Sequence, residues 1–466
     1  MKIMLIISET PYLNVFFSKV VRALSCAPYN VEFILYYNSE LANKDYSHLF
    51  SKNIKVYKYR TACLGDHAPI QITLNWSLAY ISWERQWHAK AFTYDEKSIR
   101  TILQDLHVSI SSVIASEKPD FVFYEYPSSI LGEILYQVCQ ASGGSKYLAI
   151  SQSRMQGRIE IADQKYSFSI INPDADELSD DMLIRFNNDF ISKRALPSYM
   201  LDKSNASLHE VGLVWHYLSR LRRLRFYLSN ISMLVNGANY ETKEAYGMLF
   251  SNLRNHALRR IRRLFLKEKY DFIVESERYI LFPLHVVPES SVSGCAMFFS
   301  DLITTIRYAA FSLPINFMLY VKEHPSAVGT RNRQFYREIN KIPNVRLIDH
   351  NISTEKLIKN ADSIVTLSST IGLEAALIGK YVFLLGDVVY QYHPMCIKIS
   401  SIIELREKIV MQRQDLSPDQ LESINIAFWR EYIAHTIPGN ILDAFENFEG
   451  DALYKVLLKL GARVAI

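Results

Sequence analysis

The chain has 466 residues, of which 49% are hydrophobic and 21% charged, a composition typical of globular proteins and not of disordered ones. A chain of this length predicts two domains, because a single hydrophobic core rarely grows beyond about 300 residues. The net charge of +4 is too small to indicate a nucleic-acid partner, and five cysteines without a CxxC pair favour a reduced, cytoplasmic compartment over disulfides or zinc.

Short apolar runs alternate with amphipathic segments along the first third of the chain. They predict strands at residues 3–7, 31–37, 54–59, 121–125 and 147–150, and helices at 13–24, 97–117 and 128–140. Such alternation is typical of a parallel, doubly wound sheet, so we assign residues 1–205 to a Rossmann-like domain, with loops and short helices from 152 onward. The first apolar run is too short for a signal sequence, and no run reaches the roughly 20 apolar residues that cross a bilayer.

Residues 206–270 are predicted to be helical and basic. Four arginines lie close together on one amphipathic helix, at Arg259, Arg260, Arg262 and Arg263. We expect them to form a solvated helix face or to bind an anionic membrane surface. Nucleic acid is not expected as a partner, because no DNA- or RNA-binding motif accompanies them.

The alternation of strand and helix resumes in residues 271–415. Strands are predicted at 279–284, 317–321, 345–348, 363–367 and 381–385, and helices at 298–312, 331–341, 353–360 and 370–378. Residues 416–466 are expected to form C-terminal helices, at 416–436 and 440–460. Two Rossmann-like domains joined by a helical segment are the GT-B architecture, whose active site would lie in the cleft between them: residues 1–205 would bind the acceptor and residues 271–415 the nucleotide-sugar.

Polar residues follow two strands of the second domain directly. The run FMLYV is followed by Lys322, His324 and Pro325. The run SIVTL is followed by three hydroxyl residues at a predicted helix start, Ser368, Ser369 and Thr370. Ligands bind beyond the carboxyl ends of parallel strands, and a helix start with hydroxyls and an imidazole suits a phosphate. This pattern predicts a nucleotide site, although an ordinary N-cap and a structural histidine would give it too.

Further candidates lie near these two motifs. Glu374 comes one helical turn after Thr370, where its carboxylate can accept hydrogen bonds from a ribose or simply complement the helix dipole. The loop after residues 279–284 carries three residues that we expect to contact the base or sugar of a nucleotide, unless this loop binds no ligand: His285, Pro288 and Glu289.

The first domain would supply the base that deprotonates an acceptor hydroxyl. Glu9 and Glu125 each end a predicted strand, and Glu125 is our candidate for the catalytic base, on position alone. Arg154 and Arg158 follow another strand and could bind an anionic sugar or acceptor, although solvated loop arginines would look the same. GxGxxG, Walker A, HExxH and CxxC patterns are absent from the sequence, so neither a metal site nor a cofactor is predicted.

The second half of the chain resembles the bacterial capsule polysaccharide biosynthesis family, which includes Kdo transferases and whose site is similar to that of bacterial sialyltransferases. The resemblance rests on FPLHVVPESS at 282–291, VKEHP at 321–325 and LSSTIGLEAALIGKYVFLLG at 367–386. It implies an inverting, metal-independent GT-B enzyme with a CMP-activated ulosonic acid as donor. By this resemblance His324, Ser368 and Ser369 would bind the CMP phosphate, and Glu374 the ribose.

One position departs from the family pattern. Val287 precedes Pro288 where the Kdo transferases carry glutamine, so sialic, pseudaminic and legionaminic acids stand beside Kdo as expected donors. We expect transfer from a CMP-sugar to a capsule or surface glycan, free or lipid-linked, in the cytoplasm or peripherally at the inner membrane. A transferase that uses a UDP- or GDP-hexose and a non-catalytic scaffold of the capsule assembly machinery remain open alternatives.

Overall fold

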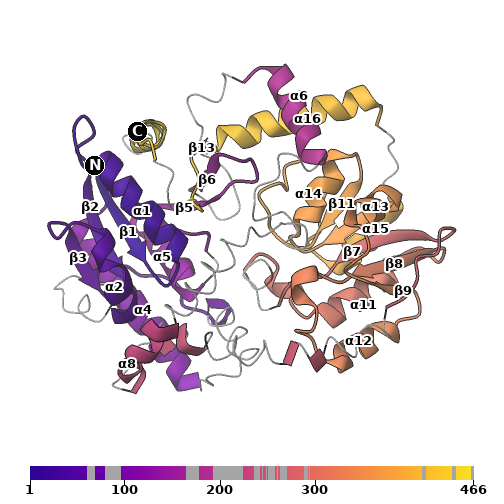
Figure 1. The fold of residues 1–466 in the computed structure, drawn as a ribbon, viewed down its shortest axis with the longest axis horizontal. Helices are drawn as coiled ribbons and strands as arrows, with labels where there is room; N and C mark the ends of the chain where they lie inside the picture. The colour runs from indigo at the N-terminus through magenta and orange to yellow at the C-terminus, as the bar shows by residue number, and fades with distance from the viewer. Residues whose placement is uncertain are drawn as a thin grey trace.

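The computed structural model describes residues 1–59, 69–78, 96–127, 129–163, 178–192, 224–235, 242–243, 245–247, 249, 258–259, 261–262, 270–287, 292, 294–411, 416–442 and 448–462. Four of the residues singled out above lie outside this set: Arg260, Arg263, Pro288 and Glu289. The described residues form two α/β domains that lie side by side, the first indigo to purple and the second orange in Figure 1.

The first domain is built on a seven-stranded sheet with the order β13-β6-β5-β4-β1-β2-β3. Strands β1 to β5 are parallel, whereas β6 pairs antiparallel with β5 and β13 antiparallel with β6. The strands are β1 (Lys2–Ile7), β2 (Glu32–Tyr37), β3 (Lys55–Lys58), β4 (Phe121–Tyr124), β5 (Lys146–Gln152), β6 (Arg158–Ala162) and β13 (Thr436–Pro438). Its helices are α1 (Pro11–Leu24), α2 (Glu40–Tyr46), α4 (Glu96–Glu117) and α5 (Ile130–Ser142), with a 3-10 turn η1 (Ser47–Leu49).

The second domain is built on a parallel six-stranded sheet with the order β12-β11-β10-β7-β8-β9. The strands are β7 (Arg278–Pro283), β8 (Phe317–Lys322), β9 (Val345–Ile348), β10 (Ser363–Thr366), β11 (Tyr381–Leu384) and β12 (Cys396–Lys398). The helices are α11 (Leu302–Ser312), α12 (Arg333–Asn340), α13 (Thr354–Asn360), α14 (Thr370–Leu377) and α15 (Ile402–Met411).

Buried apolar side chains fill both faces of these sheets, as expected for parallel strands covered by helices. In the second domain, α11, α12 and α15 pack on the face that includes Ile280 and Phe282, while α13 and α14 pack on the face that includes Leu281. Neighbouring residues of one strand thus belong to different layers, as the period of two requires. The parallel sheets confirm the predicted doubly wound α/β architecture.

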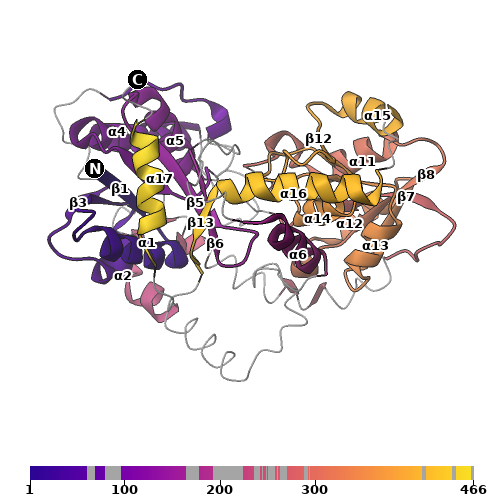
Figure 2. The same ribbon diagram turned by 90° about the horizontal axis from the view of Figure 1, so that it is seen from above.

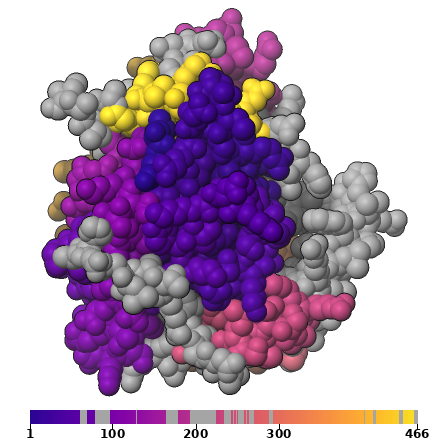
Figure 3. Space-filling view, turned by 90° about the vertical axis from the view of Figure 1, so that its left-hand side faces the viewer, coloured from indigo at the N-terminus to yellow at the C-terminus, as the bar shows by residue number. Residues whose placement is uncertain are grey.

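The end of the chain connects the two domains (Figures 1 and 2). Helix α16 (Pro418–Ala434) begins with a capping box at Ser417 and packs against α6 (Asp180–Ile191) in the core of the second domain. After α16 the chain returns to the first domain, where β13 joins the sheet and α17 (Asp451–Ala462) covers the core. Figure 3 shows this yellow C-terminal part lying on the indigo N-terminal part.

These contacts differ from the segmentation expected from the sequence. Helix α6, expected within residues 1–205, packs with the second domain, and residues 436–441 and 451–462, expected among C-terminal helices, contribute to the first. Residues 152–205 contain the strand β6 and the 12-residue helix α6, and the predicted helix at 440–460 starts only at Asp451. The domain limits 1–205, 206–270, 271–415 and 416–466 stay a prediction.

The described parts of residues 206–270 contact both domains. Tyr227 and Tyr246 pack with Leu41 of α2 in a small buried cluster, and Lys44 donates to Asn230 Oδ1 at 3.1 Å. In Figure 3 the pink residues of this segment lie against the lower edge of the first domain. None of the helices in the described ranges is long and apolar enough to cross a membrane.

Candidate nucleotide-binding site

The carboxyl ends of three neighbouring strands bring the predicted nucleotide-binding residues together. Strand β7 lies between β8 and β10, and the chain order reverses at this point: β8 and β9 continue on one side and β10 and β11 on the other. His285 follows β7, His324 follows β8 and Ser368 follows β10. Such a switch point is where open parallel sheets bind ligands.

His324 is held at the start of a 3-10 turn, η6 (Pro325–Ala327). Its Nδ1 accepts the backbone N–H of Ser326 at 3.1 Å, and the backbone is extended, as the following proline favours. Because Nδ1 is an acceptor, the proton of the neutral imidazole lies on Nε2. The half-buried side chain therefore carries its N–H donor on the side away from the turn.

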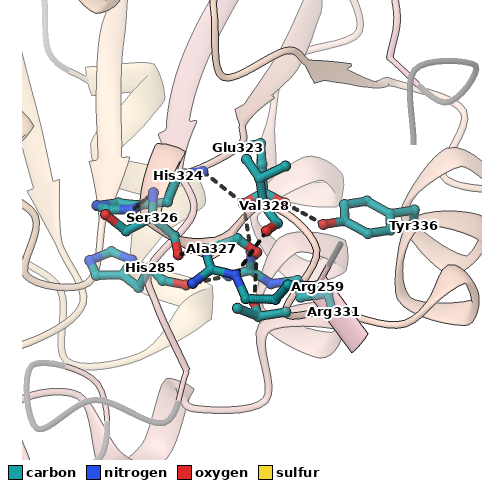
Figure 4. Close-up of polar contacts among 10 residues, drawn as sticks. Arg259, His285, Glu323, His324, Ser326, Ala327, Val328, Arg331 and Tyr336 are labelled. Atoms are coloured by element: carbon teal, nitrogen blue, oxygen red, sulfur yellow. Dashed lines mark hydrogen bonds and ion pairs between the residues drawn. The ribbon is translucent and has the colours of Figure 1, made fainter. Parts of the chain in front are cut away.

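A buried carboxylate next to it fixes this turn (Figure 4). Glu323 has an exposed fraction of 0% and accepts the backbone N–H of His324 at 2.7 Å. Arg331 Nη1 donates to the same oxygen at 2.5 Å, and Tyr336 of α12 donates to the other at 2.6 Å. Burial and the neighbouring Glu323 hold the pKa of Tyr336 well above its usual value. Sequence reasoning missed Glu323 and Arg331, because a glutamate between lysine and histidine looks solvated.

His285 links this turn to the next strand end. Its Nε2 accepts the backbone N–H of Ser368 at 3.2 Å, and its carbonyl accepts a hydrogen bond from Arg331. The side chain is buried, and burial, followed by the charges of His324 and Arg331, lowers the pKa of His285 to about 3. His285 is therefore neutral near pH 7, and its hydrogen bond to Ser368 links the ends of β7 and β10. Its contact with the base or sugar of a nucleotide stays a prediction.

The helix start at Ser369 is capped as expected. More of its backbone N–H groups form hydrogen bonds within the protein than the sequence suggested. Ser369 Oγ accepts the N–H of Ile371 at 3.3 Å, and Ser369 N–H donates to Thr366 Oγ1 at 3.2 Å. Together with the bond from Ser368 to His285, three backbone N–H groups near the helix start are bonded within the protein itself: those of Ser368, Ser369 and Ile371. A phosphate would then rely on the hydroxyls of Ser368, Ser369 and Thr370 and on the dipole of α14.

Gly372 allows a close contact with a tyrosine that sequence reasoning missed. The Tyr390 hydroxyl donates to the carbonyl of Ser369, and a Cβ at Gly372 would lie 2.5 Å from that hydroxyl. The absence of a side chain at Gly372 thus leaves room for Tyr390. Burial raises the pKa of Tyr390 well above 10, the negative charge of Glu374 adds to this, and the positive charge of Arg154 opposes it.

Three further predicted residues belong to the same strand ends and turns. Lys322 is buried and donates from Nζ to the carbonyl of His350 at 3.1 Å, so its ammonium group lies at the junction of β8 and β9. Glu374 is half-buried, one turn after the start of α14. Pro325 is the first residue of η6 and sets the direction of the chain after His324.

Glu9 and Glu125 lie at the corresponding switch point of the first sheet, where β1 and β4 are neighbours. Glu9 accepts a hydrogen bond from the Ser39 hydroxyl at 2.9 Å. Burial and the negative charge of Glu125 raise the pKa of Tyr12 to about 12. The charge of Glu125 therefore acts on the Tyr12 hydroxyl, while the Glu9 carboxylate faces Ser39, the N-cap of α2.

Arg154 and Arg158 have different surroundings. Arg154 Nη1 donates at 3.0 Å to Glu160, whose exposed fraction is 0%, and Tyr432 of α16 donates to the same carboxylate. Arg158 Nε donates at 2.6 Å to Thr436 Oγ1 and so joins β6 to β13. Arg154 thus lies where α16 meets the first domain, and its charge influences Tyr390 of the second domain.

In the described part of the chain, no group of three or more His, Cys, Asp or Glu side chains is arranged to hold a metal ion. Two doubly wound domains, with polar residues gathered at the switch point of each sheet, define a protein of the GT-B fold. Residues 227–403 match the family described as capsule polysaccharide biosynthesis protein, the same family that the motifs of this half resemble.

Relatives of known name are distant. Protein FixF of Sinorhizobium fredii (strain NBRC 101917 / NGR234) is 32% identical over 142 residues, which are 28% of this chain and 33% of that protein, so the chain spans a third of the relative's length. The β-Kdo 2,7-transferase domain of Thermosulfurimonas dismutans KpsC is 13% identical and has a TM-score of 0.35, covering 79% of this chain and 97% of that one. A UDP-GlcNAc 2-epimerase from Methanocaldococcus jannaschii is also 13% identical, with a TM-score of 0.26 and coverage of 91% and 98%.

Proposed function

We propose that this protein is a glycosyltransferase of capsule or surface polysaccharide assembly that uses a CMP-activated ulosonic acid as donor. One observation carries the proposal: the His324 turn and the Ser369 helix start lie at one switch point, inside a capsule polysaccharide biosynthesis domain. A phosphate placed there would meet an imidazole N–H, serine hydroxyls and a helix N-terminus, which are groups suited to its charge.

In the proposed reaction the first domain binds the acceptor and the second domain binds the CMP-sugar. Glu125 takes the proton of the acceptor hydroxyl as the acceptor oxygen attacks the anomeric carbon of the sugar. The bond from that carbon to the phosphate oxygen breaks, and the electron pair leaves with CMP. Attack from the face opposite the phosphate inverts the anomeric configuration.

Hydrogen-bond donors of the second domain would stabilise the negative charge on the leaving CMP. His324 donates from Nε2 to the phosphate, and the hydroxyls of Ser368, Ser369 and Thr370 donate alongside it. Glu323 and Arg331 hold the turn that carries His324, so the imidazole N–H is oriented before the nucleotide binds. With these donors in place, the proposed reaction is metal-independent.

The sugar and the ribose would be held by residues at the domain junction. Arg154 is our first candidate for the carboxylate of the ulosonic acid, because its charge reaches Tyr390 of the second domain even though its Nη1 is paired with Glu160, whereas Arg158 joins β6 to β13 through Thr436. Glu374 would accept hydrogen bonds from the ribose, one turn into α14.

A panel of donors tests this function. Purified protein is incubated with CMP-Kdo and with CMP-linked sialic, pseudaminic and legionaminic acids, with and without a chelator, and release of CMP is measured. We expect release from at least one CMP-sugar, unchanged by the chelator. Release from UDP- or GDP-hexoses alone would favour the alternative transferase.

Thermal shifts with CMP, UDP and GDP complement the panel, because a ligand that binds only the folded state raises the melting temperature. A shift with CMP and little with UDP or GDP is expected. No shift with any nucleotide, and no turnover, would favour a non-catalytic scaffold of the assembly machinery. Vesicles of anionic lipid, added to the same assays, test the proposed peripheral membrane location.

A further inference from the structure

A helical piece of the basic segment contacts the loop that follows the His324 turn. Arg259 donates from Nε to the carbonyl of Val328 at 3.2 Å and from Nη2 to the carbonyl of Ser326. Figure 4 shows Arg259 reaching this loop beside Arg331. One guanidinium group therefore spans two carbonyls within three residues of Pro325, a geometry that the planar fork of arginine suits.

A second arginine and a glycine complete this contact. Arg262, one helical turn after Arg259, donates from Nη1 to the carbonyl of Thr330 at 2.6 Å. Gly329 has a φ of +78°, and a Cβ on it would lie 2.7 Å from the carbonyl oxygen of Arg259. Residue 329 must therefore be glycine for two reasons. Its positive φ strains any other residue, and a side chain there would collide with the backbone of Arg259.

The turn that carries His324 and the loop after it are therefore held by two sets of contacts. Glu323 and Arg331 hold the start of the turn, as described above. Arg259 and Arg262 bind the carbonyls of residues 326, 328 and 330. The two guanidinium groups also place positive charge next to the turn, which favours an anionic ligand there.

We propose that Arg259 and Arg262 are positioning residues of the nucleotide site: they hold the His324 turn in its donating geometry and do not form a membrane-binding face. This inference rests on the proposed function for the identity of the ligand. It assigns a role within the site to a basic segment that the sequence suggested was solvated or lipid-bound. Residues 259 and 262 then act on phosphate binding through the turn that they hold.

The test compares Arg259→Gln, Arg259→Lys and Arg262→Gln with Arg337→Gln, an exposed arginine of α12 that serves as the charge-matched control. CMP affinity is measured by calorimetry, and melting temperature by circular dichroism. We expect Arg259→Gln and Arg262→Gln to bind CMP about tenfold more weakly, since each removes hydrogen bonds from a charged group. Arg259→Lys should be nearly as weak, because an ammonium cannot span two carbonyls. Affinity equal to wild type in both Arg259 variants would overturn the proposal.

Two further measurements show whether Arg259 and Arg262 hold the His324 turn or bind a membrane surface. Hydrogen exchange of the peptide 323–332 should become faster in Arg259→Gln but not in Arg337→Gln, since the Ala327 and Thr330 amides are bonded within this turn. Sedimentation with phosphatidylglycerol vesicles should be the same for all variants, and lost vesicle binding with unchanged CMP affinity would overturn the inference. If wild-type protein binds no CMP, UDP or GDP, the proposed function fails, and hydrogen exchange alone decides whether these arginines hold the turn.

Discussion

The two crevices of this protein share a topology but differ in how their polar residues are held. In the second domain, hydrogen bonds run from Ser368 to His285 and from Arg331 to both His285 and Glu323, so three strand ends form one connected unit. In the first domain, Glu9 and Glu125 lie at the matching switch point, where Glu9 accepts a hydrogen bond from Ser39 and the charge of Glu125 acts on Tyr12. The comparison teaches that the proposed nucleotide site is preorganised, whereas the catalytic base is defined only by its position.

The sharpest test of the first crevice compares its two carboxylates. Glu125→Gln should lower transfer to an acceptor by about 10²–10⁴-fold, the usual contribution of a general base. Glu9→Gln should stay near the wild-type rate, because its carboxylate is already engaged by Ser39. Both are measured with the donor found in the CMP-sugar panel. A larger loss in Glu9→Gln would reverse the assignment of the base.

The connected unit of the second crevice should depend strongly on Glu323. In Glu323→Gln the charge of Arg331 stays buried without its carboxylate, which is expected to lower the free energy of unfolding by about 3–5 kcal/mol. Urea denaturation measures this loss. Glu338→Gln, which removes a surface partner of Lys341, is the control and should change stability little. Equal effects of the two substitutions would show that Glu323 does not organise the turn.

Acid should destabilise the protein partly through His285. Its pKa is about 3 in the folded protein and about 6.5 when unfolded, so below pH 6.5 the unfolded chain binds a proton that the folded chain does not. Stability is therefore fully present above pH 6.5 and declines as the pH falls toward 3, by about 2 kcal/mol from this group at pH 5.

Urea denaturation at pH 7 and pH 5 measures this dependence. His285→Asn should show a smaller loss between the two pH values than wild type, although His393, whose pKa burial lowers to about 4, still contributes. The same pH dependence in variant and wild type would contradict a buried, neutral His285.

Gly372→Ala should produce a smaller, local effect. Its new methyl group would collide with the Tyr390 hydroxyl, at an expected cost of about 1–3 kcal/mol in stability. Gly144→Ala is the control, because a Cβ there has no atom within 4 Å. The double variant with Tyr390→Phe should lose less than the sum of the two single variants, since the hydroxyl is gone. Strict additivity would show that the two residues do not interact.

The fold was largely predictable because buried parallel strands leave a strong signal. Runs such as Val345–Ile348 were expected at the positions where the structure has them. The strand β6 and the helix α6 were missed, because their sequences are partly polar and their partners are distant in the chain: β6 pairs with β13 and α6 packs against α16, each more than 200 residues further on. Local pattern cannot show partners that distant in the chain.

The sequence predicted which motifs form the candidate site, but not the hydrogen bonds that join them. His324 and Ser369 stood out because each follows an apolar run. The roles of Glu323 and Arg331 arise only when the turn folds back and brings a carboxylate, a guanidinium and a carbonyl together. Likewise, an amphipathic arginine face looks the same in sequence whether its partner is water, lipid or the carbonyls that bind Arg259.

Calorimetric titration with CMP and with cytidine most directly tests whether the His324 turn and the Ser369 helix start bind a nucleotide phosphate. Wild-type protein should bind CMP and bind cytidine far more weakly, because the phosphate provides the charge-assisted contacts. His324→Ala should lose at least about tenfold in CMP affinity while its weak cytidine affinity stays the same. Equal affinities for CMP and cytidine, or unchanged CMP affinity in His324→Ala, would contradict a phosphate site at these strand ends.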